Sequence, residues 1–364
     1  MALMRKGVQM DKQIQSNEVQ SQRQEFYKEL DPLNLAPLWE VLADLVTPEP
    51  NTPAVPAKWS FDEARDYLMR AGDLITAKEA ERRVLILENP AMRGTSSITR
   101  TLYAGLQLVL PGEVAVGHRH TQSALRFIMD GGGAFTAVEG ERAYMERFDL
   151  ILTPNWHWHD HGNDTDDPII WLDGLDVPLL LSLDASFAEA LVTGEDDAVQ
   201  DELRPAGDTL HRYGGNMRPV SGSTSDVSPT QQPLFHYPYK EWCANLRDVA
   251  AAGKPDPHFG TRMEFVNPAT AGPVMPTMSA FSQFLPADFS TKPVQSTDGG
   301  VFTVCEGTGQ AKIGDEVFDL SPREVFVVPA WAEFSLTAQD DLTLFNFSDK
   351  AAQEKLNLWR QKKH

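Results

Sequence analysis

Five of the nine histidines lie in two short patches whose spacing suits a metal site. The first patch holds His118 and His120, and the second holds His157, His159 and His161. Alternate residues of a β-strand point to the same face, so the first patch presents two imidazoles together. Imidazole binds iron, zinc, copper or nickel, and a third ligand would come from the second patch. Spacing alone leaves both His157 and His159 open as that ligand.

The sequence around the histidines has the composition of short β-strands. Apolar, β-branched and aromatic runs alternate with turns that contain glycine and proline. We expect strands at residues 84–87, 98–110, 124–130, 134–139, 150–152 and 169–172, and one more that carries His118 and His120. Many short strands joined by such turns predict a mainly β protein of the sandwich or jelly-roll barrel type.

The last hundred residues repeat the pattern of this first barrel. Three landmarks recur 175 or 176 residues later: Leu110-Pro111 as Leu285-Pro286, Gly131-x-Gly133 as Gly307-x-Gly309, and Pro154-x-Trp156 as Pro329-x-Trp331. An offset of 175 places Pro293, Gln295 and Phe334 at the histidine positions. The second copy thus keeps the scaffold without the ligands, which indicates that the histidines serve chemistry and not folding.

Helical periodicity and prolines divide the rest of the chain. In the first part, Ser60 should begin a helix, with Glu63 completing a capping box. We predict a helical N-terminal arm at 1–80, a metal-binding barrel at 81–183, an inter-domain connection at 184–260 with a helix near 240–252, and a metal-free barrel at 261–364 that ends in a helix at 351–361. The arm could pack on its own barrel or on a neighbouring subunit, and the sequence leaves both open.

Charge and cysteine content exclude several classes of partner. The net charge of −20 argues against binding to nucleic acid or to an anionic membrane. The longest apolar run, residues 325–332, is too short to cross a bilayer and contains Pro329. Cys243 and Cys305 are expected to be free thiols in a reducing compartment. These observations predict a cytoplasmic protein.

The histidine patches resemble the two sequence motifs of the cupin family. Three residues fit the first motif and three fit the second: Gly112, His118 and His120, then Pro154, His159 and Asn163. The second motif assigns the third ligand to His159 and not to His157. The resemblance implies a bicupin, with two jelly-roll barrels and helical extensions at both ends.

Two departures from the cupin motifs are informative. The glutamate ligand of the first motif is missing, because Ala124 and Leu125 stand in its place. Phe148 and Trp156 replace the two glycines of the second motif. The resemblance therefore implies a site of three histidines without a carboxylate.

More narrowly, the chain resembles the gentisate 1,2-dioxygenases, which are bicupins that cleave aromatic rings. The resemblance rests on residues 81–83, 118–127, 158–163 and 171–176 and spans nearly the whole chain. It implies Fe(II), O2, a homotetramer, and opening of gentisate to maleylpyruvate. Salicylate and 1-hydroxy-2-naphthoate dioxygenases are close alternatives. A metal-dependent cupin isomerase or decarboxylase and a storage bicupin are more distant ones.

Three neutral histidines would leave a bound Fe(II) with its full double positive charge, which favours a chelating anion such as a 2-hydroxybenzoate. Arg126 lies on the strand face of Ala124 and Ile128, and a guanidinium among apolar strands needs an anion. That anion is either the substrate carboxylate or a structural acid. We expect the first, with the second as the alternative.

Further side chains are candidates for roles beside the metal. His161 shares the parity of His159 and could steer O2 or transfer a proton. Asp173 could orient His161 or a ligand, or could be an acid in a turn. Tyr103 and Gln107 share a strand face with Gly105 and could bind the 5-hydroxyl of the substrate. Arg82 and Arg83 could add substrate contacts or form salt bridges.

Overall fold

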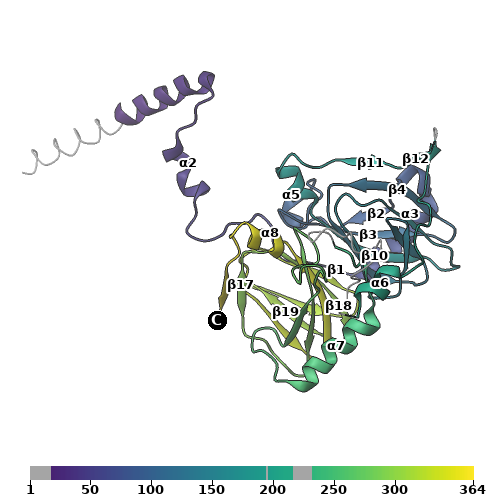
Figure 1. Cartoon of the computed structure of the whole chain (residues 1–364). Helices are drawn as coiled ribbons and strands as arrows, with labels where there is room; N and C mark the ends of the chain where they lie inside the picture. Colours follow the sequence, from purple (N-terminus) through teal and green to yellow (C-terminus); the bar gives the residue numbers. More distant parts are fainter. Residues whose placement is uncertain (1–17, 194–195, 216–231) are drawn as a thin grey trace, which may run out of the picture. The chain divides into compact units, whose positions relative to one another are not determined.

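The computed structural model describes residues 18–193, 196–215 and 232–364 (Figure 1). The chain divides into two units, Met1–Asn51 and Thr52–His364. In the described part of the first unit, residues 18–30 form a helix that is followed by the 3-10 helix η1 (Asp31–Leu33) and by α2 (Leu38–Leu45). The expected arm before residue 18 lies outside the described residues.

The first barrel consists of two antiparallel sheets. Their strand orders are β14-β8-β5-β10-β3-β2 and β11-β4-β9-β6-β7. The bounds are β2 (Val84–Ile86), β3 (Tyr103–Val109), β4 (Val114–His120), β5 (Ala124–Asp130), β6 (Phe135–Val138), β7 (Glu141–Tyr144), β8 (Leu150–Thr153), β9 (His159–Gly162), β10 (Ile169–Leu175), β11 (Ala188–Ala190) and β14 (His236–Tyr237). The mainly β class and the expected strands are confirmed, and β7 and β9 are additions to them.

The second barrel repeats this arrangement with the orders β1-β21-β18-β23-β16-β15 and β20-β19-β22-β17-β24. The bounds are β1 (Ala57–Trp59), β15 (Thr261–Glu264), β16 (Ser279–Leu285), β17 (Val294–Ser296), β18 (Gly300–Glu306), β19 (Gly309–Ile313), β20 (Glu316–Leu320), β21 (Val325–Val328), β22 (Phe334–Ala338), β23 (Leu342–Ser348) and β24 (Gln361–Lys363). Three strands come from outside the expected barrels. β1 comes from the N-terminal part, whereas β11 and β14 of the first barrel come from the connection.

Helices and a small ribbon complete the second unit. Their bounds are α3 (Phe61–Leu74), α4 (Ala77–Ala80), η2 (Pro90–Met92), α5 (Val177–Ser182), α6 (Asp208–Tyr213), α7 (Tyr239–Ala252), α8 (Lys350–Lys355), β12 (Val192–Thr193) and β13 (Asp196–Asp197). Ser60 caps α3 as expected and accepts a hydrogen bond from the Glu63 amide at 3.3 Å. Cys243 and Cys305 are free thiols. In the described parts of the chain, no helix is both long and apolar enough to cross a bilayer.

Two expected elements differ from the structure at their ends. The strand expected from residue 98 begins only at Tyr103, because the amides of Ile98 and Thr99 turn back to the Leu102 carbonyl. The C-terminal helix expected at 351–361 is α8 alone. Asn357 has a positive φ of 58°, which breaks the helix, and residues 361–363 then form β24 on the edge of β17.

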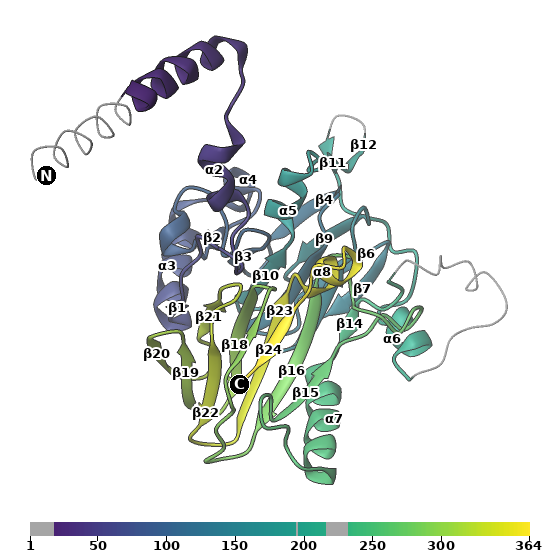
Figure 2. The same cartoon turned by 90° about the vertical axis from the view of Figure 1, so that its left-hand side faces the viewer.

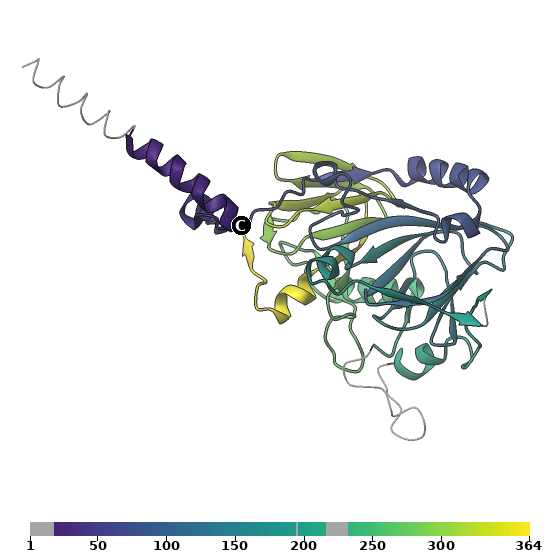
Figure 3. The same cartoon turned by 90° about the horizontal axis from the view of Figure 1, so that it is seen from above.

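The two barrels pack through one sheet each, and Figures 2 and 3 show these sheets side by side. Leu125, Phe127 and Met129 of β5 share one hydrophobic core with Phe345 and Phe347 of β23. The rings of Phe127 and Phe345 stack with centroids 4.0 Å apart and planes inclined by 7°. The alternate residues of each strand face the interior of their own barrel. These strands are therefore buried on both faces, which accounts for their nearly continuous apolar sequence.

The strand registers correct the alignment of the two barrels. His118 pairs with His159 between β4 and β9, and the matching pair between β17 and β22 is Val294 with Phe334. The second barrel therefore has Val294 and Ser296, and not Pro293 and Gln295, at the positions of His118 and His120. The extra residue before Gly307 precedes these positions, so the offset there is already 176. The second barrel still has no metal ligand at any of the three positions.

The stacked core between the barrels should dominate the stability of the second unit. We predict that Phe345→Ala lowers the free energy of unfolding by about 3–5 kcal/mol, the usual cost of deleting a fully buried aromatic ring. Urea unfolding followed by circular dichroism measures this. Val317→Ala, at a side chain that is 55% exposed, is the control and should cost less than about 0.5 kcal/mol. A loss below about 1 kcal/mol for Phe345→Ala would show that the barrels do not depend on this contact.

Candidate metal centre

Three imidazoles converge inside the first barrel. One nitrogen from each of His118, His120 and His159 lies within 4.8 Å of the corresponding atoms of the other two. The ring centroids of His118 and His120 are 4.2 and 4.7 Å from that of His159. His159 is fully buried on β9, whose neighbour in the sheet is the strand β4. The structure thus brings together the three residues that the sequence nominated.

A β-bulge in β4 decides which side chains face the interior. Ala115 pairs with His161 and His118 pairs with His159, so β4 has one extra residue between these pairs. Without it, alternation from Ala115 would turn Arg119 inward and both histidines of β4 outward. Gly117 occupies the bulge, where a Cβ atom would lie 2.9 Å from the Leu191 side chain. Bulges beside functional sites commonly re-aim side chains in this way.

Backbone carbonyl groups fix the orientation of two of the rings. His120 Nδ1 lies 2.9 Å from the Gln122 carbonyl oxygen, and His159 Nδ1 lies 2.9 Å from that of His157. A carbonyl accepts only, so each Nδ1 carries the proton and each Nε2 keeps its lone pair. Within the described protein, the buried Nε2 of His159 has no hydrogen-bond partner. These are the properties of a metal ligand.

The electrostatics of the site keep the imidazoles neutral. Burial lowers the pKa of His118 to about 3, and the nearby Arg82 cation contributes to the same shift. Burial lowers the pKa of His120 to about 4, with Arg126 as the next cause. Burial also places the pKa of His159 well below its ordinary value. Protons therefore do not compete with a metal ion for these nitrogens at neutral pH.

Arg82 directly contacts His118, one of the three clustered histidines. Its Nη2 lies 2.6 Å from His118 Nδ1 and also donates to the Val116 carbonyl at 3.0 Å. A guanidinium only donates, so His118 Nδ1 accepts here and the proton resides on Nε2. Ligation through Nε2 requires the other tautomer, in which Arg82 loses its bond to His118 but keeps those from Nη1 to the Glu81 carbonyl and from Nη2 to the Val116 carbonyl. The donor set itself, three neutral imidazoles without a carboxylate, fits a divalent transition metal.

A buried guanidinium lies beside the histidines. Arg126 of β5 is 5% exposed, and its Nη1 donates to Thr153 Oγ1. Its Nε is 3.7 Å from Asp173 Oδ1 and has no hydrogen-bond partner among the described residues. Trp171 Nε1 donates to the same Asp173 oxygen at 2.9 Å. Arg126 thus has one structural acid nearby and also, within the described structure, an unpartnered Nε–H that a second anion could accept from.

Burial shifts the pKa of both members of this pair against the charged form. It lowers the pKa of Arg126 to about 10, although Asp173 opposes the shift. It raises the pKa of Asp173 to about 6, although Arg126 holds that pKa down. At neutral pH both groups remain charged.

His161 lies next to His159 on β9, with ring centroids 5.8 Å apart. Its Nδ1 is 2.9 Å from Thr136 Oγ1, and its buried Nε2 has no partner in the described part of the chain. Burial places the pKa of His161 well below its ordinary value. His161 is therefore a neutral imidazole inside the barrel that does not belong to the cluster of three histidines.

Tyr103, Gly105 and Gln107 lie on the inward face of β3, as alternation predicted. Gly105 pairs with Asp173, and Gln107 pairs with Trp171. A Cβ atom on Gly105 would lie 2.8 Å from the Tyr103 hydroxyl and 2.6 Å from Val84. Glycine therefore leaves the room that the Tyr103 hydroxyl occupies. Burial raises the pKa of Tyr103, so the phenol stays protonated.

Two candidates from the sequence, Arg83 and His157, lie outside this cluster. Arg83 forms the salt bridge that was its alternative role, with two N–H···O bonds of 2.8 Å to Glu113. His157 lies in the turn before β9, where its Nδ1 is 3.1 Å from the Asn155 carbonyl oxygen. His157 does not belong to the cluster of three histidines, although it lies two residues before His159 and alternation would place both on the same face.

Two polar residues beside the site were not predicted from the sequence: Thr136, which contacts His161, and Thr153, which accepts a hydrogen bond from Arg126. Thr153 lies on the same inward face of β8 as the apolar Ile151. A polar residue on this otherwise apolar face was the sequence signal that could have identified it.

Phe148 and Trp156 keep positive φ angles of 68° and 63°, although they replace the motif's glycines. The second barrel repeats this with Trp331 at 63°. The backbone of the motif is thus retained without its usual residues.

The ligand set can be tested by metal content. We predict that the wild type binds about one metal ion per chain and that His118→Ala, His120→Ala or His159→Ala abolishes retention, because two imidazoles bind a metal weakly. Anaerobic reconstitution with Fe(II) followed by elemental analysis measures this. His157→Ala is the matched control and should keep the metal. About two ions per chain, or loss of metal in His157→Ala alone, would contradict the assignment.

Comparison with known proteins agrees with this geometry. Residues 105–176 match the family described as cupin domain. Gentisate 1,2 dioxygenase 1 of Aquipseudomonas alcaligenes is 50% identical over 346 residues, 95% of this chain and 98% of that protein. The 5-aminosalicylate 1,2-dioxygenase of a Comamonas species is 37% identical over 92% of this chain and 89% of that protein. Salicylate 1,2-dioxygenase of Pseudoaminobacter salicylatoxidans, in its adduct with gentisate, has a TM-score of 0.87 and 34% identity over 94% of each chain. The chain therefore belongs to the gentisate 1,2-dioxygenase family.

Proposed function

We propose that this chain is an Fe(II)-dependent dioxygenase that opens gentisate between the carboxyl-bearing and hydroxyl-bearing carbons to give maleylpyruvate. Both atoms of O2 enter the product. The observation that carries this proposal is the convergence of three neutral imidazoles beside a buried guanidinium whose Nε–H has no hydrogen-bond partner among the described residues. Membership of the family favours this reaction over that of an isomerase, a decarboxylase or a storage protein.

Iron is the metal that this chemistry requires. Fe(II), when bound to His118, His120 and His159, supplies a redox-active Lewis acid with open positions for a chelating hydroxy acid and for O2. The three residues are neutral, so they leave the full charge of the ion available to an anionic substrate. The protein's part is to place the substrate and to exclude water from a buried site.

The substrate carboxylate would lie against Arg126. Its Nε has no hydrogen-bond partner in the described structure, and a charge-assisted bond to a carboxylate would satisfy it. Arg82 is the second cation next to the histidines, since its Nη2 lies 2.6 Å from His118 Nδ1, and it is a further candidate to contact the same anion. Tyr103 and Gln107 offer polar tips on the inward face of β3, where the 5-hydroxyl of gentisate would bind. Arg83 is a weaker candidate, because Glu113 already neutralises it.

His161 and Asp173 are the two remaining candidates, one for proton transfer and one for positioning Arg126. The unpartnered Nε2 of His161 could accept a proton from the substrate hydroxyl in the tautomer in which Nδ1 carries the proton and donates to Thr136 Oγ1. Asp173 orients Arg126 by a contact of 3.7 Å and is itself oriented by Trp171. We therefore assign Asp173 a positioning role and His161 a catalytic one.

We expect Arg126 to contribute to substrate binding mainly through a hydrogen bond to the substrate carboxylate. Losing a hydrogen bond to a charged group costs on the order of 1.5–3 kcal/mol. Arg126→Leu should therefore keep its iron while kcat/KM for gentisate falls roughly ten- to a hundred-fold. Steady-state oxygen uptake with Fe(II)-loaded protein measures this.

The amide of gentisate provides the control for this variant. The amide should be a poor substrate of the wild type and should lose little more in Arg126→Leu, because the missing partner is the same. Equal losses for acid and amide, or a variant without iron, would show that Arg126 has only a structural role with Asp173.

The same variant has a second readout in its pH profile. Burial raises the pKa of Asp173 to about 6, and the Arg126 cation holds it down. Because Asp173 acts through Arg126, its ionisation should set an acidic limb of kcat/KM near pH 6 in the wild type, and Arg126→Leu should lose that limb. An acidic limb that persists unchanged in Arg126→Leu would mean that the ionisation of Asp173 does not act through Arg126.

We infer that the chain forms a homotetramer, supported by its N-terminal unit. In α2 the side chains of Leu38, Trp39, Leu42 and Leu45 are 48–67% exposed. Neighbouring apolar side chains that remain exposed usually mark a surface that binds another chain. Sedimentation equilibrium should give a tetramer for the full chain and smaller species for Trp39→Asp. A monomeric wild type would contradict the proposal.

A further inference from the structure

The second barrel contains a cavity at the place where the first barrel holds its metal site. Its volume is about 320 Å³, which lies in the range of small-molecule sites. Val294, Ser296 and Phe334, the counterparts of the three metal-binding histidines, line it. The second barrel has therefore lost the ligands but has not filled the space.

This cavity has a cation of its own, on a different strand. Phe302 occupies the position of Arg126, and Asn346 occupies the position of Asp173. Arg262 enters from the edge strand β15, and its Nη2 donates to Asn346 Oδ1 at 3.3 Å. Its guanidinium carbon lies 4.0 Å from the centroid of the Phe281 ring. A guanidinium again faces a polar residue of the central strand, now without histidines.

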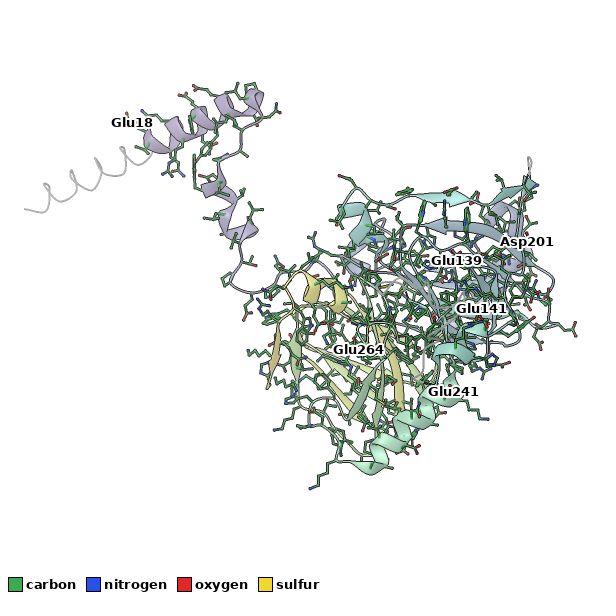
Figure 4. The ribbon with its side chains drawn as sticks, viewed as in Figure 1. Glu18, Glu139, Glu141, Asp201, Glu241 and Glu264 are labelled. Atoms are coloured by element: carbon green, nitrogen blue, oxygen red, sulfur yellow. The ribbon has the colours of Figure 1, made fainter. Side chains whose placement is uncertain are left out.

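Two polar atoms on the wall of the cavity lack partners. The Nε of Arg262 and the Oε1 of Glu264 are buried and have no hydrogen-bond partner in the described structure. Both residues lie on β15, two positions apart, so their side chains point to the same face of the strand. Figure 4 shows Glu264 among the strands of the second barrel. Because an unpaired buried donor and acceptor are costly, a ligand that accepts from Arg262 and donates to Glu264 would stabilise this wall.

Aromatic rings form much of the remaining wall, beside polar side chains that include Asp298 and Lys350. Phe281, Phe302, Phe334 and Trp359 line the cavity, and Lys350 Nζ lies 4.8 Å from the centroid of the Trp359 ring. We propose that the second barrel binds a small aromatic carboxylate with a hydroxyl group on its ring, without any metal. Arg262 binds the carboxylate and Glu264 accepts the hydroxyl proton in a hydrogen bond. Two positions along a strand span about 6.6 Å, which a carboxylate and a hydroxyl on opposite ends of one ring can bridge.

This inference goes beyond the ring-cleavage proposal and does not depend on it. The probe is 4-hydroxybenzoate, which has both groups but no hydroxyl next to the carboxylate and so cannot chelate a metal as gentisate would. Isothermal titration of the iron-loaded full chain should show one site with the modest affinity of a ligand of this size. Arg262→Met should weaken binding roughly ten- to a hundred-fold, while iron content stays unchanged.

Two variants separate the barrels. Arg126→Met removes the guanidinium of the first barrel and should leave the binding of 4-hydroxybenzoate unchanged. Ser296→Leu fills the cavity without changing Arg262 and should abolish binding of the probe. This variant provides the test if thermal unfolding shows that Arg262→Met is unstable. Benzoate, which lacks the hydroxyl, should bind to the wild type more weakly than the probe does. Glu264→Leu, which removes the acceptor, should bind benzoate and the probe equally.

Absence of binding to the wild type at millimolar probe would overturn the proposal. Loss of binding in Arg126→Met with retention in Ser296→Leu would also overturn it, because the probe would then lie in the first barrel.

Discussion

The structure depends on the apolar contact between the two barrels. Each barrel contributes the outer face of one sheet, and the stacked rings of Phe127 and Phe345 lie within this contact. Because one face of β5, β10, β18 and β23 is covered by the other barrel, their opposite faces are free to line two interiors. The second barrel is therefore part of the support for the metal site, although it has no metal ligands at the matching positions.

Burial is also the source of the chemistry in the first barrel. Burial of His118, His120 and His159 lowers the pKa of each, and so keeps the three imidazoles neutral with no carboxylate among them. The same burial makes a lone guanidinium unfavourable, and Asp173 compensates only part of that cost at 3.7 Å. An anionic substrate would complete the compensation. The site should therefore favour a negatively charged ligand.

Comparison of the barrels shows how one scaffold holds two interiors. The backbone keeps its unusual positions, with φ of 63° at both Trp156 and Trp331. The charged groups have moved: the guanidinium lies on β5 in one barrel and on β15 in the other. The scaffold is retained because it forms the shared core, whereas the interior positions are free to change. This explains why the second cavity has persisted with new polar groups.

Much of the fold and the site could be read from the sequence, because alternation and turn residues are local signals. They predicted the strands, the repeat, the shared face of His118 and His120, and the shared face of Ala124, Arg126 and Ile128. They could not give the bulge at Gly117, which alone turns these histidines inward, because a bulge is defined by pairing with β9. For the same reason Val294 and Ser296 were misaligned by one residue. The partner of Arg83 and the strand β24 likewise depend on residues distant in the chain. Sequence thus determined which residues share a face, and only tertiary pairing decided which way that face points.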